Sequence, residues 1–305
     1  MLRLTERPER LTNMEGRQLS HSQNFLKSSE FVGMLIGSAG IKKEDFVVEI
    51  GPGKGIIARE LSKKAGKVVG VETDPNLARN LRAGFSDSEN VEIIESDFLK
   101  WDLPRQPYKV FANIPFNMTA DIVKKLLFAE NPPEAAYLIM QDRAAGRFMG
   151  PPYGPTSQMS TLLQPFYNMG IIAKVDRREF EPVPNVNAVL ARFEKREQPL
   201  VPRDQQSLYR DFVIYGYNQW KPTLTEALKG VFGRKQLSIV ERNFNLKGLK
   251  PSELNIEQWT GIFGVFIQHI PQDKKDIVKG AEKRQRLKQS NMKKEYRTRD
   301  RSRRR

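Results

Sequence analysis

The sequence predicts an α/β protein in which a mostly parallel sheet of about seven strands is followed by a small all-helical domain and a basic, disordered tail. Three observations support this fold class. Apolar, β-branched runs alternate with helical patterns up to residue 193, strand signals stop after Glu197, and apolar residues nearly vanish after Gln272. Strands that alternate with helices are typical of βαβ units, whose strands lie parallel.

The predicted strands form a parallel group and a final pair. The parallel group is Phe46–Ile50, Lys67–Glu72, Val91–Glu95, Tyr108–Ala112 and Ala135–Met140, with helices expected at Ile56–Lys63 and Pro75–Ala83. The final pair, Ile171–Val175 and Val189–Phe193, is separated by a proline-bearing loop with no room for a long helix. We therefore expect these two strands to pair antiparallel.

The domain organisation follows from changes in composition along the 305 residues. Residues 1–19 are expected to be an N-terminal extension, and residues 20–197 the sheet domain. Residues 198–272 form a helical domain, introduced by the proline-bearing QPLVPRD segment, and residues 273–305 a disordered tail. Helices in the second domain are predicted at Gln205–Gln219, Thr223–Gly230 and Ile256–His269.

Charge and residue usage restrict the function classes. The chain has a formal net charge of +15, and its last 33 residues, from Asp273, hold 15 basic and 5 acidic side chains. Such a tail favours a polyanion, with RNA or DNA preferred over a membrane because the tail has no apolar face. No spanning segment or signal peptide is visible, so we expect a cytoplasmic protein. With no cysteine and two distant histidines, His21 and His269, no metal site is predicted.

A glycine-rich loop follows the first strand of the parallel group. The stretch VVEIGPGKG places Gly51, Gly53 and Gly55 between a strand and a helix, where the backbone can approach a ligand closely. The dinucleotide fingerprint would need glycine at position 56, where this chain has Ile56, so a nicotinamide cofactor is disfavoured.

Acidic residues end the next two strands. Glu72 is placed to accept hydrogen bonds from both hydroxyls of a ribose, and Asp97 to accept one from an adenine amino group, with Phe98 beside the ring. Each acidic residue taken singly could equally be a loop or cap residue. Three strand ends in order predict a nucleoside cofactor.

The stretch VFANIPFNMTADIV puts Asn113, Ile114, Pro115 and Phe116 at the end of the fourth strand. If the cofactor is S-adenosylmethionine and the acceptor is the 6-amino group of adenine, the Asn113 amide oxygen and the carbonyl of Ile114 or Pro115 could accept the amine hydrogens. Phe116 would stack on the base. The lack of cysteine fits an exocyclic amine better than a pyrimidine carbon. A plain turn with a buried aromatic is the alternative.

These motifs together resemble the ribosomal RNA adenine dimethylases, and within them the Erm methyltransferases of macrolide, lincosamide and streptogramin B resistance. HSQNFL, EIGPGKG, VETDP, SDFL, ANIPFNMTADIV and KVDRREFEPVPNV occur in the family's order. The resemblance implies a Rossmann-like, S-adenosylmethionine-dependent methyltransferase sheet. It also implies a cofactor site and a target-base site, the first holding Asn24, Leu26, Gly51, Gly53, Glu72, Asp97, Phe98 and Asn113, and the second holding Phe116 and a second aromatic, Phe180.

The resemblance also suggests a substrate. The leading hypothesis is methylation of the 6-amino group of one adenine in the peptidyl-transferase loop of 23S rRNA, naked or partly assembled, by a monomer that does not act on DNA or membranes. Ile114, where small-subunit enzymes usually have leucine, and the basic extension favour it. Asn185 stands where the family commonly has lysine. A 16S-type dimethyltransferase of ribosome biogenesis and a non-catalytic RNA-binding factor stay open.

Overall fold

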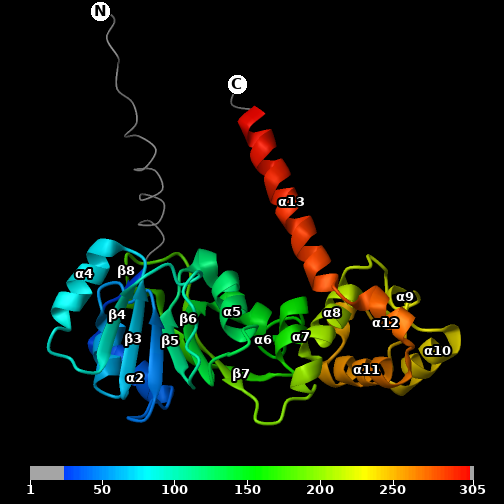
Figure 1. Ribbon diagram of the computed structural model, residues 1–305, viewed down its shortest axis with the longest axis horizontal. Helices are drawn as coiled ribbons and strands as arrows, with labels where there is room; N and C mark the ends of the chain where they lie inside the picture. The colour runs from blue at the N-terminus through cyan, green and yellow to red at the C-terminus, as the bar shows by residue number, and fades with distance from the viewer. Residues whose placement is uncertain (1–23, 303–305) are drawn as a thin grey trace, which may run out of the picture. The chain divides into compact units, whose positions relative to one another are not determined.

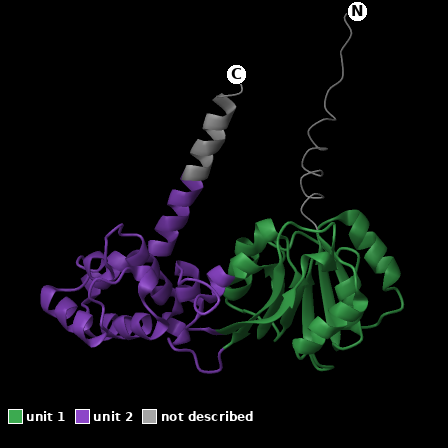
Figure 2. Cartoon of the chain, turned by 180° about the vertical axis from the view of Figure 1, so that it is seen from behind, with its two compact units in different colours: residues 1–145, 168–195 green, residues 146–167, 196–305 purple. Residues whose placement is uncertain are grey.

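The computed structural model describes residues 24–302, with side chains described for residues 24–291. The predicted extension at residues 1–19 lies outside this range. The chain divides into two compact units, Met1–Ala145 with Asn168–Lys195 and Gly146–Tyr167 with Arg196–Arg305 (Figure 2). The sequence predicts that residues 146–167 belong to the sheet domain, whereas their contacts lie with the helices of the second unit.

The sheet of the first unit has seven strands in the order β4-β3-β2-β5-β6-β9-β7, which confirms the predicted α/β class (Figure 1). Strands β2 to β6 pair parallel, and β9 runs antiparallel to β6, with Ala135 opposite Glu194. The bounds are β2 Phe46–Ile50, β3 Lys67–Glu72, β4 Val91–Glu95, β5 Lys109–Asn113, β6 Ala135–Gln141, β7 Tyr167–Val175 and β9 Ala188–Lys195.

The order of these strands creates a switch point. The chain proceeds from β2 to β3 and β4 on one side, and then returns to place β5 and β6 on the other side of β2. In open parallel sheets, ligands bind where the strand order reverses, outside the carboxyl ends of the strands. The fold therefore predicts a site beyond the ends of β2 and β5.

Two helices of the first unit, α2 and α4, begin at side-chain caps. The Ser28 hydroxyl accepts from Phe31 N at 3.1 Å, and the Asp74 carboxylate accepts from Asn76 N at 2.8 Å, with Pro75 in the first turn. Both caps satisfy amide groups that a helix start leaves unpaired. The helices are α2 Ser29–Ser38, α3 Ile56–Ser62, α4 Pro75–Gly84, α5 Thr119–Leu127 and α6 Asp142–Met149, which runs into the second unit.

The core of the first unit joins α2 and α3 to one face of the sheet. Ile36 of α2 and Leu61 of α3 belong to one buried cluster with Val47 of β2, Phe111 of β5 and Ile139 of β6. The alternating side chains of each strand supply this face with apolar residues. This shared core holds α2 and α3 against the strands β2, β5 and β6.

A second sheet of two short strands was not predicted from the sequence. Strand β1, Phe25–Leu26, pairs antiparallel with β8, Phe180–Glu181, so that Leu26 lies opposite Phe180. The Lys27 N–H also donates to the carbonyl of Glu179 at 3.0 Å. This pairing connects segments more than 150 residues apart, which local sequence patterns do not reveal.

The second unit is built around aromatic side chains of α8, Gln206–Tyr217, and α11, Ile256–His269. Phe212 lies edge-on to Trp259 at 6.1 Å, and the Tyr209 hydroxyl donates to the Thr161 carbonyl at 3.1 Å. Because Thr161 belongs to α7, Gln158–Leu163, this bond helps explain why residues 146–167 group with the helices. This unit also contains α9 Leu224–Ala227 and α10 Arg234–Asn243.

The prediction of a disordered tail from residue 273 is wrong for the described residues. Helix α12 spans Gln272–Val278 and α13 spans Ala281–Ser302. The Asp211 carboxylate of α8 accepts from Gly280 N and Glu282 N, at 2.7 and 2.9 Å, and Val278 is fully buried. Composition could not reveal these contacts, because a cap supplied by another helix stabilises α13 without adding apolar residues. Within residues 24–302, no helix is long and apolar enough to cross a bilayer.

Candidate active site

A cavity of about 260 Å³ lies beyond the carboxyl ends of β2, β3, β4 and β5, where the strand order predicts a site. Each of these strands contributes residues at its end or just after it. The lining residues are Asn24, Phe25, Ile50, Gly51, Gly53, Val71, Glu72, Thr73, Ser96, Asp97, Phe98, Asn113, Ile114, Pro115, Phe116, Met118 and Ile122. All four strand-end motifs singled out from the sequence therefore meet in one cavity.

The loop after β2 follows a path that requires glycine. Gly51, Gly53 and Gly55 have φ angles of +64°, +58° and +79°, in the region that other residues rarely adopt. A Cβ added at Gly53 would lie 2.6 Å from the Phe25 ring, whereas one at Gly51 meets nothing within 4 Å. The glycines thus form a wall that a ligand can approach closely.

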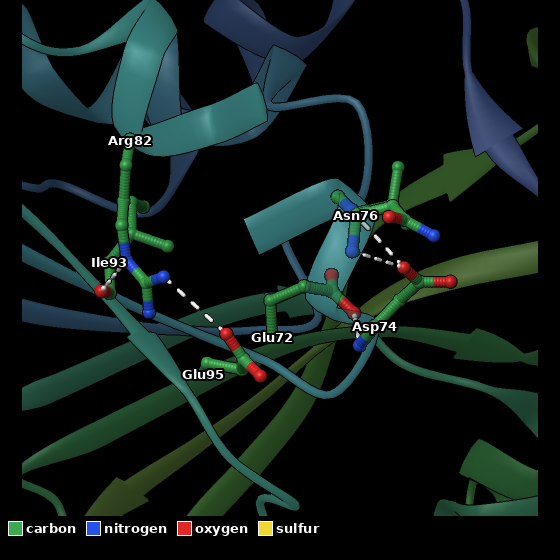
Figure 3. A network of polar contacts seen from close by, with 7 residues as sticks. Glu72, Asp74, Asn76, Arg82, Ile93 and Glu95 are labelled. Carbon is green, nitrogen blue, oxygen red and sulfur yellow. Dashed lines mark hydrogen bonds and ion pairs between the residues drawn. The ribbon is translucent and has the colours of Figure 1, made fainter. Parts of the chain in front are cut away.

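The Glu72 carboxylate at the end of β3 is held by the backbone (Figure 3). Its Oε1 accepts from Thr73 N at 2.8 Å and Asp74 N at 3.0 Å, and its Oε2 accepts from Gly53 N at 2.9 Å. A carboxylate offers about four acceptor sites. Glu72 therefore keeps acceptor capacity for a ligand, chiefly on Oε2, where the sequence predicts the ribose hydroxyls.

Figure 3 also shows how the neighbouring helix is attached to β4. The Arg82 side chain of α4 donates to the carbonyl of Ile93 at 3.2 Å and forms an ion pair with Glu95 at 3.4 Å. The Arg82 and Glu95 side chains are both partly exposed, so the pair adds little stability. Its effect is to fix the position of α4 beside the strand whose end carries Asp97.

Glu49 of β2 is a buried acid that the sequence did not single out. It is 1% exposed, and among the described residues no donor reaches its Oε2. Burial, and secondarily the charge of Glu72, raise the pKa of Glu49 well above its ordinary value. The protonated form is therefore favoured by folding.

Replacement of Glu49 by glutamine is expected to stabilise the protein at neutral pH by about 1–3 kcal/mol. Because the pKa of Glu49 is raised on folding, its contribution to stability is lost as the pH rises from the unfolded value, about 4.3, through the folded one. The gain should therefore be larger at pH 8 than at pH 5 in urea denaturation. The exposed Glu44→Gln should change stability by no more than about 0.5 kcal/mol at either pH. An equal gain at both pH values would contradict this account.

The segment after β4 presents one free carboxylate oxygen and one aromatic ring. Asp97 Oδ1 accepts from Leu99 N at 2.9 Å, which fixes the side chain, and among the described residues its Oδ2 has only a 3.9 Å ion pair with the exposed Lys100. Phe98 is 5% exposed, and the Lys125 ammonium lies 5.4 Å from its ring centre. Oδ2 and the Phe98 ring thus suit an amino-substituted aromatic ring such as adenine.

Asn113 at the end of β5 is oriented by the N-terminal segment. Its Nδ2 donates to the carbonyl of Asn24 at 2.7 Å, across 89 residues of sequence. A carbonyl oxygen accepts only from a donor, so this bond determines which end of the amide is nitrogen. The Asn113 Oδ1 is left as an acceptor at the cavity.

The residues after Asn113 form a turn that leads into α5. Ile114 N donates to the carbonyl of Ile139 at 3.2 Å, and the Pro115 carbonyl already accepts from Met118 N at 3.0 Å. Phe116 begins a single 3-10 turn, lines the cavity and packs against the buried core cluster. Because a carbonyl oxygen has two lone pairs, Pro115 could still accept a second hydrogen, but the Ile114 carbonyl accepts no hydrogen bond within the described residues and is preferred.

Two residues predicted for the site do not line the cavity. Leu26 is 6% exposed and Phe180 is fully buried, and both belong to the core cluster of the first unit. They lie opposite each other in the β1–β8 pair, so their side chains share one face of that sheet, and this face is the core. Stacking of Phe180 on a target base is thus wrong for this conformation.

Phe25 takes the place that the sequence gave to Leu26. It lines the cavity, and the Lys54 ammonium lies 5.1 Å from its ring centre. Neighbouring residues of a strand point to opposite sides, so only one of Leu26 and Phe25 can face the cavity. No signal within the two residues Phe25–Leu26 shows which side chain faces the cavity, because the pairing of β1 with β8 decides it.

The fold, with a cavity at its switch point, is that of a Rossmann-like methyltransferase domain. The residues fit S-adenosylmethionine on structural grounds, because a left-handed glycine loop, an open acceptor on Glu72 and the Asp97–Phe98 pair surround one cavity. Comparison with known proteins then gives the family.

Residues 15–268 match the family described as ribosomal RNA adenine dimethylase, and the chain belongs to this family. It is 32% identical over 253 residues to ribosomal RNA small subunit methyltransferase A of Acaryochloris marina, covering 79% of this chain and 94% of that protein. It is also 32% identical to an rRNA adenine N-6-methyltransferase of Saccharopolyspora erythraea, covering 83% of this chain and 66% of that protein.

Among solved structures, 23S rRNA methyltransferase ErmE matches with a TM-score of 0.72 and 28% identity, over 80% of this chain and 100% of that one. A dimethyladenosine transferase from Plasmodium falciparum matches with a TM-score of 0.59 at 22% identity, which supports the fold. The protein is an S-adenosylmethionine-dependent enzyme that methylates rRNA.

Proposed function

We propose that the enzyme methylates the 6-amino group of a single adenine in the peptidyl-transferase loop of 23S rRNA, and thereby gives resistance to macrolide, lincosamide and streptogramin B antibiotics. The observation that carries the chemistry is the orientation of Asn113, whose Nδ2 is bound to the Asn24 carbonyl, which leaves Oδ1 at the cavity. We expect a monomer that acts on naked or partly assembled RNA in the cytoplasm.

The chain's own residues bind and orient the reactants of this reaction, and the proton that the methylated amine loses passes to water. S-adenosylmethionine, when bound, supplies an electrophilic methyl group, and Gly51, Gly53, Glu72 and Asp97 are the residues that would hold it. The 6-amino nitrogen of adenine is a poor nucleophile because its lone pair is delocalised into the ring.

Two acceptors at the end of β5 address that problem. Asn113 Oδ1 and the Ile114 carbonyl can each accept one amine hydrogen, which favours a pyramidal nitrogen with its lone pair directed at the methyl group. Phe116 can stack on the base and stabilise the positive charge that develops on the nitrogen. Orientation of the amine then supplies most of the rate gain.

The choice of 23S rRNA is supported by the ErmE match and by the basic C-terminal residues. A 16S-type dimethylase is the second candidate, because small subunit methyltransferase A of Acaryochloris marina is 32% identical and this chain covers 94% of its length. For the second compact unit and the C-terminal residues we propose RNA binding, through phosphate contacts that position the substrate.

Incubation of the purified enzyme with labelled S-adenosylmethionine and separate 23S and 16S transcripts should place label in 23S RNA, at one adenine of the peptidyl-transferase loop. Primer extension or mass spectrometry of the labelled RNA would locate that adenine. Label in 16S RNA only would exclude the 23S proposal and support the second candidate. Label in neither RNA, together with measurable RNA binding, would instead support the non-catalytic RNA-binding factor.

A further inference from the structure

A groove of about 560 Å³ lies within the second compact unit, far along the sequence from the residues of the active-site cavity. It is formed by the end of α8, the residues that follow it, α12 and the first turns of α13, and Figure 1 shows these helices together. Its lining includes the aromatic residues Tyr215 and Trp220 and the cations Arg284 and Lys288. Four more lining residues are Asn or Gln, and no Asp or Glu occurs among the described lining residues.

Trp220 is the unusual residue of this groove. Its side chain is 95% exposed, in contrast to Trp259, which is fully buried. Its φ angle is +53°, a left-handed conformation that is unfavourable for a bulky residue. An exposed indole on a strained backbone gains little from packing, so the fold of this chain does not explain it.

The Arg284 cation of the groove keeps its charge available. The Arg284 guanidinium donates to the carbonyls of Lys279 at 2.7 Å and Ile277 at 2.9 Å, which are neutral groups. The nearby carboxylates are engaged elsewhere, since Asp211 caps α13 and Glu282 pairs with Arg210 at 3.1 Å. The groove therefore combines a positive charge held in place with an exposed aromatic ring.

We propose that this groove binds an unpaired nucleotide of the RNA substrate, with the base stacked on Trp220 and the adjoining phosphate on Arg284 and Lys288. Aromatic rings bind bases by stacking without strong sequence preference, and amide side chains can pair with base edges. Arg284 and Lys288 lie beyond residue 268, where the family match ends, whereas Tyr215 and Trp220 lie within it. The proposal rests on the proposed function in one respect, that RNA is the substrate.

Trp220→Ala should weaken binding of a short oligoadenylate about tenfold, the effect expected for loss of one stacked base. Trp220→Phe keeps an aromatic ring and should retain most of the affinity. Trp220→Gly should lower RNA affinity as much as Trp220→Ala without lowering the melting temperature, because glycine adopts the φ of +53° without strain. A merely structural role for Trp220 would lower stability and affinity together.

Two further variants serve as controls on charge and on exposed aromatic surface. Lys288→Gln should reduce the slope of log affinity against log salt by about 0.7, the value for one phosphate contact on a single strand. Tyr153, which is 47% exposed in the same unit, gives the matched control Tyr153→Ala, which should bind oligoadenylate as the wild type does. The dissociation constant for S-adenosylmethionine should be the same in all these variants.

The proposal is overturned if Trp220→Ala binds oligoadenylate as tightly as the wild type, and a protein partner would then be the better assignment for the groove. It is also overturned if inorganic polyphosphate, which has no bases, loses as much affinity from Trp220→Ala. If the wild type methylated no rRNA but Trp220→Ala still lost oligoadenylate affinity about tenfold, the proposed function would be rejected. The proposal that the groove binds a nucleotide would stand. If the wild type methylated 23S rRNA and Trp220→Ala bound oligoadenylate as tightly as the wild type, the proposed function would stand and the groove proposal would be rejected.

Discussion

Replacement of Asn113 by alanine is expected to lower kcat for methyl transfer by about 10²–10³-fold, the range measured when one preorganised polar contact to a reacting group is removed. The loss has a local cause, because the variant removes both the Oδ1 acceptor and the Nδ2 bond of 2.7 Å to the Asn24 carbonyl. RNA affinity should change little, since most of it comes from phosphate contacts. Single-turnover kinetics and filter binding measure the two quantities separately.

Asn117 provides the matched control for this experiment. It has the same side chain, lies four residues later and is exposed, and it does not line the cavity. Asn117→Ala should therefore keep kcat within about twofold of the wild type. If Asn113→Ala retained kcat at that level, Asn113 would have no part in orienting the amine, and the assignment of the 113–116 segment would fail.

Replacement of Gly53 by alanine should both destabilise the protein and weaken cofactor binding. The left-handed φ of +58° costs about 1–2 kcal/mol for a residue with a Cβ. The new methyl group, 2.6 Å from the Phe25 ring, adds about 1–3 kcal/mol of overpacking. Because Phe25 lines the cavity, movement of its ring should lower the affinity for S-adenosylmethionine at least about tenfold. Urea denaturation and calorimetric titration test the two effects.

Variants at two other glycines distinguish the effect of backbone strain from the effect of filling the cavity. Gly40 has a φ of +63° and nothing within 4 Å of an added Cβ, so Gly40→Ala should cost only the backbone strain and leave cofactor affinity unchanged. Gly51 has a similar φ of +64° and open space, but it lines the cavity. Gly51→Ala should therefore lose cofactor affinity with no more destabilisation than Gly40→Ala. Equal cofactor affinity in the Gly40, Gly51 and Gly53 variants would show that the glycine loop does not contact the cofactor.

Much of the site could be predicted from short motifs, for a physical reason. In a parallel sheet the carboxyl ends of neighbouring strands lie at one edge, so residues such as Gly51, Glu72, Asp97 and Asn113 meet once the strands are assigned. Alternation of strands and helices is a local pattern that the sequence carries directly. The seven-stranded sheet and the position of the cavity follow from it.

The errors concern contacts between distant segments. Leu26 and Phe180 face the core because β1 pairs with β8, and nothing in either short segment indicates which side is buried. The helices beyond residue 272 depend on Asp211 and on the burial of Val278, whereas composition records only that apolar residues are scarce there.

The amino-acid sequence by itself determined the fold class, the glycine loop, the acidic strand ends and the Asn-Ile-Pro-Phe segment. The tertiary structure alone decided that the Asn113 amide is oriented by the Asn24 carbonyl, that Glu72 keeps acceptor capacity chiefly on Oε2, and that Phe25 replaces Leu26 in the cavity. The reason is that periodicity fixes which residues form an element. Hydrogen bonds and burial between remote elements fix where each side chain points.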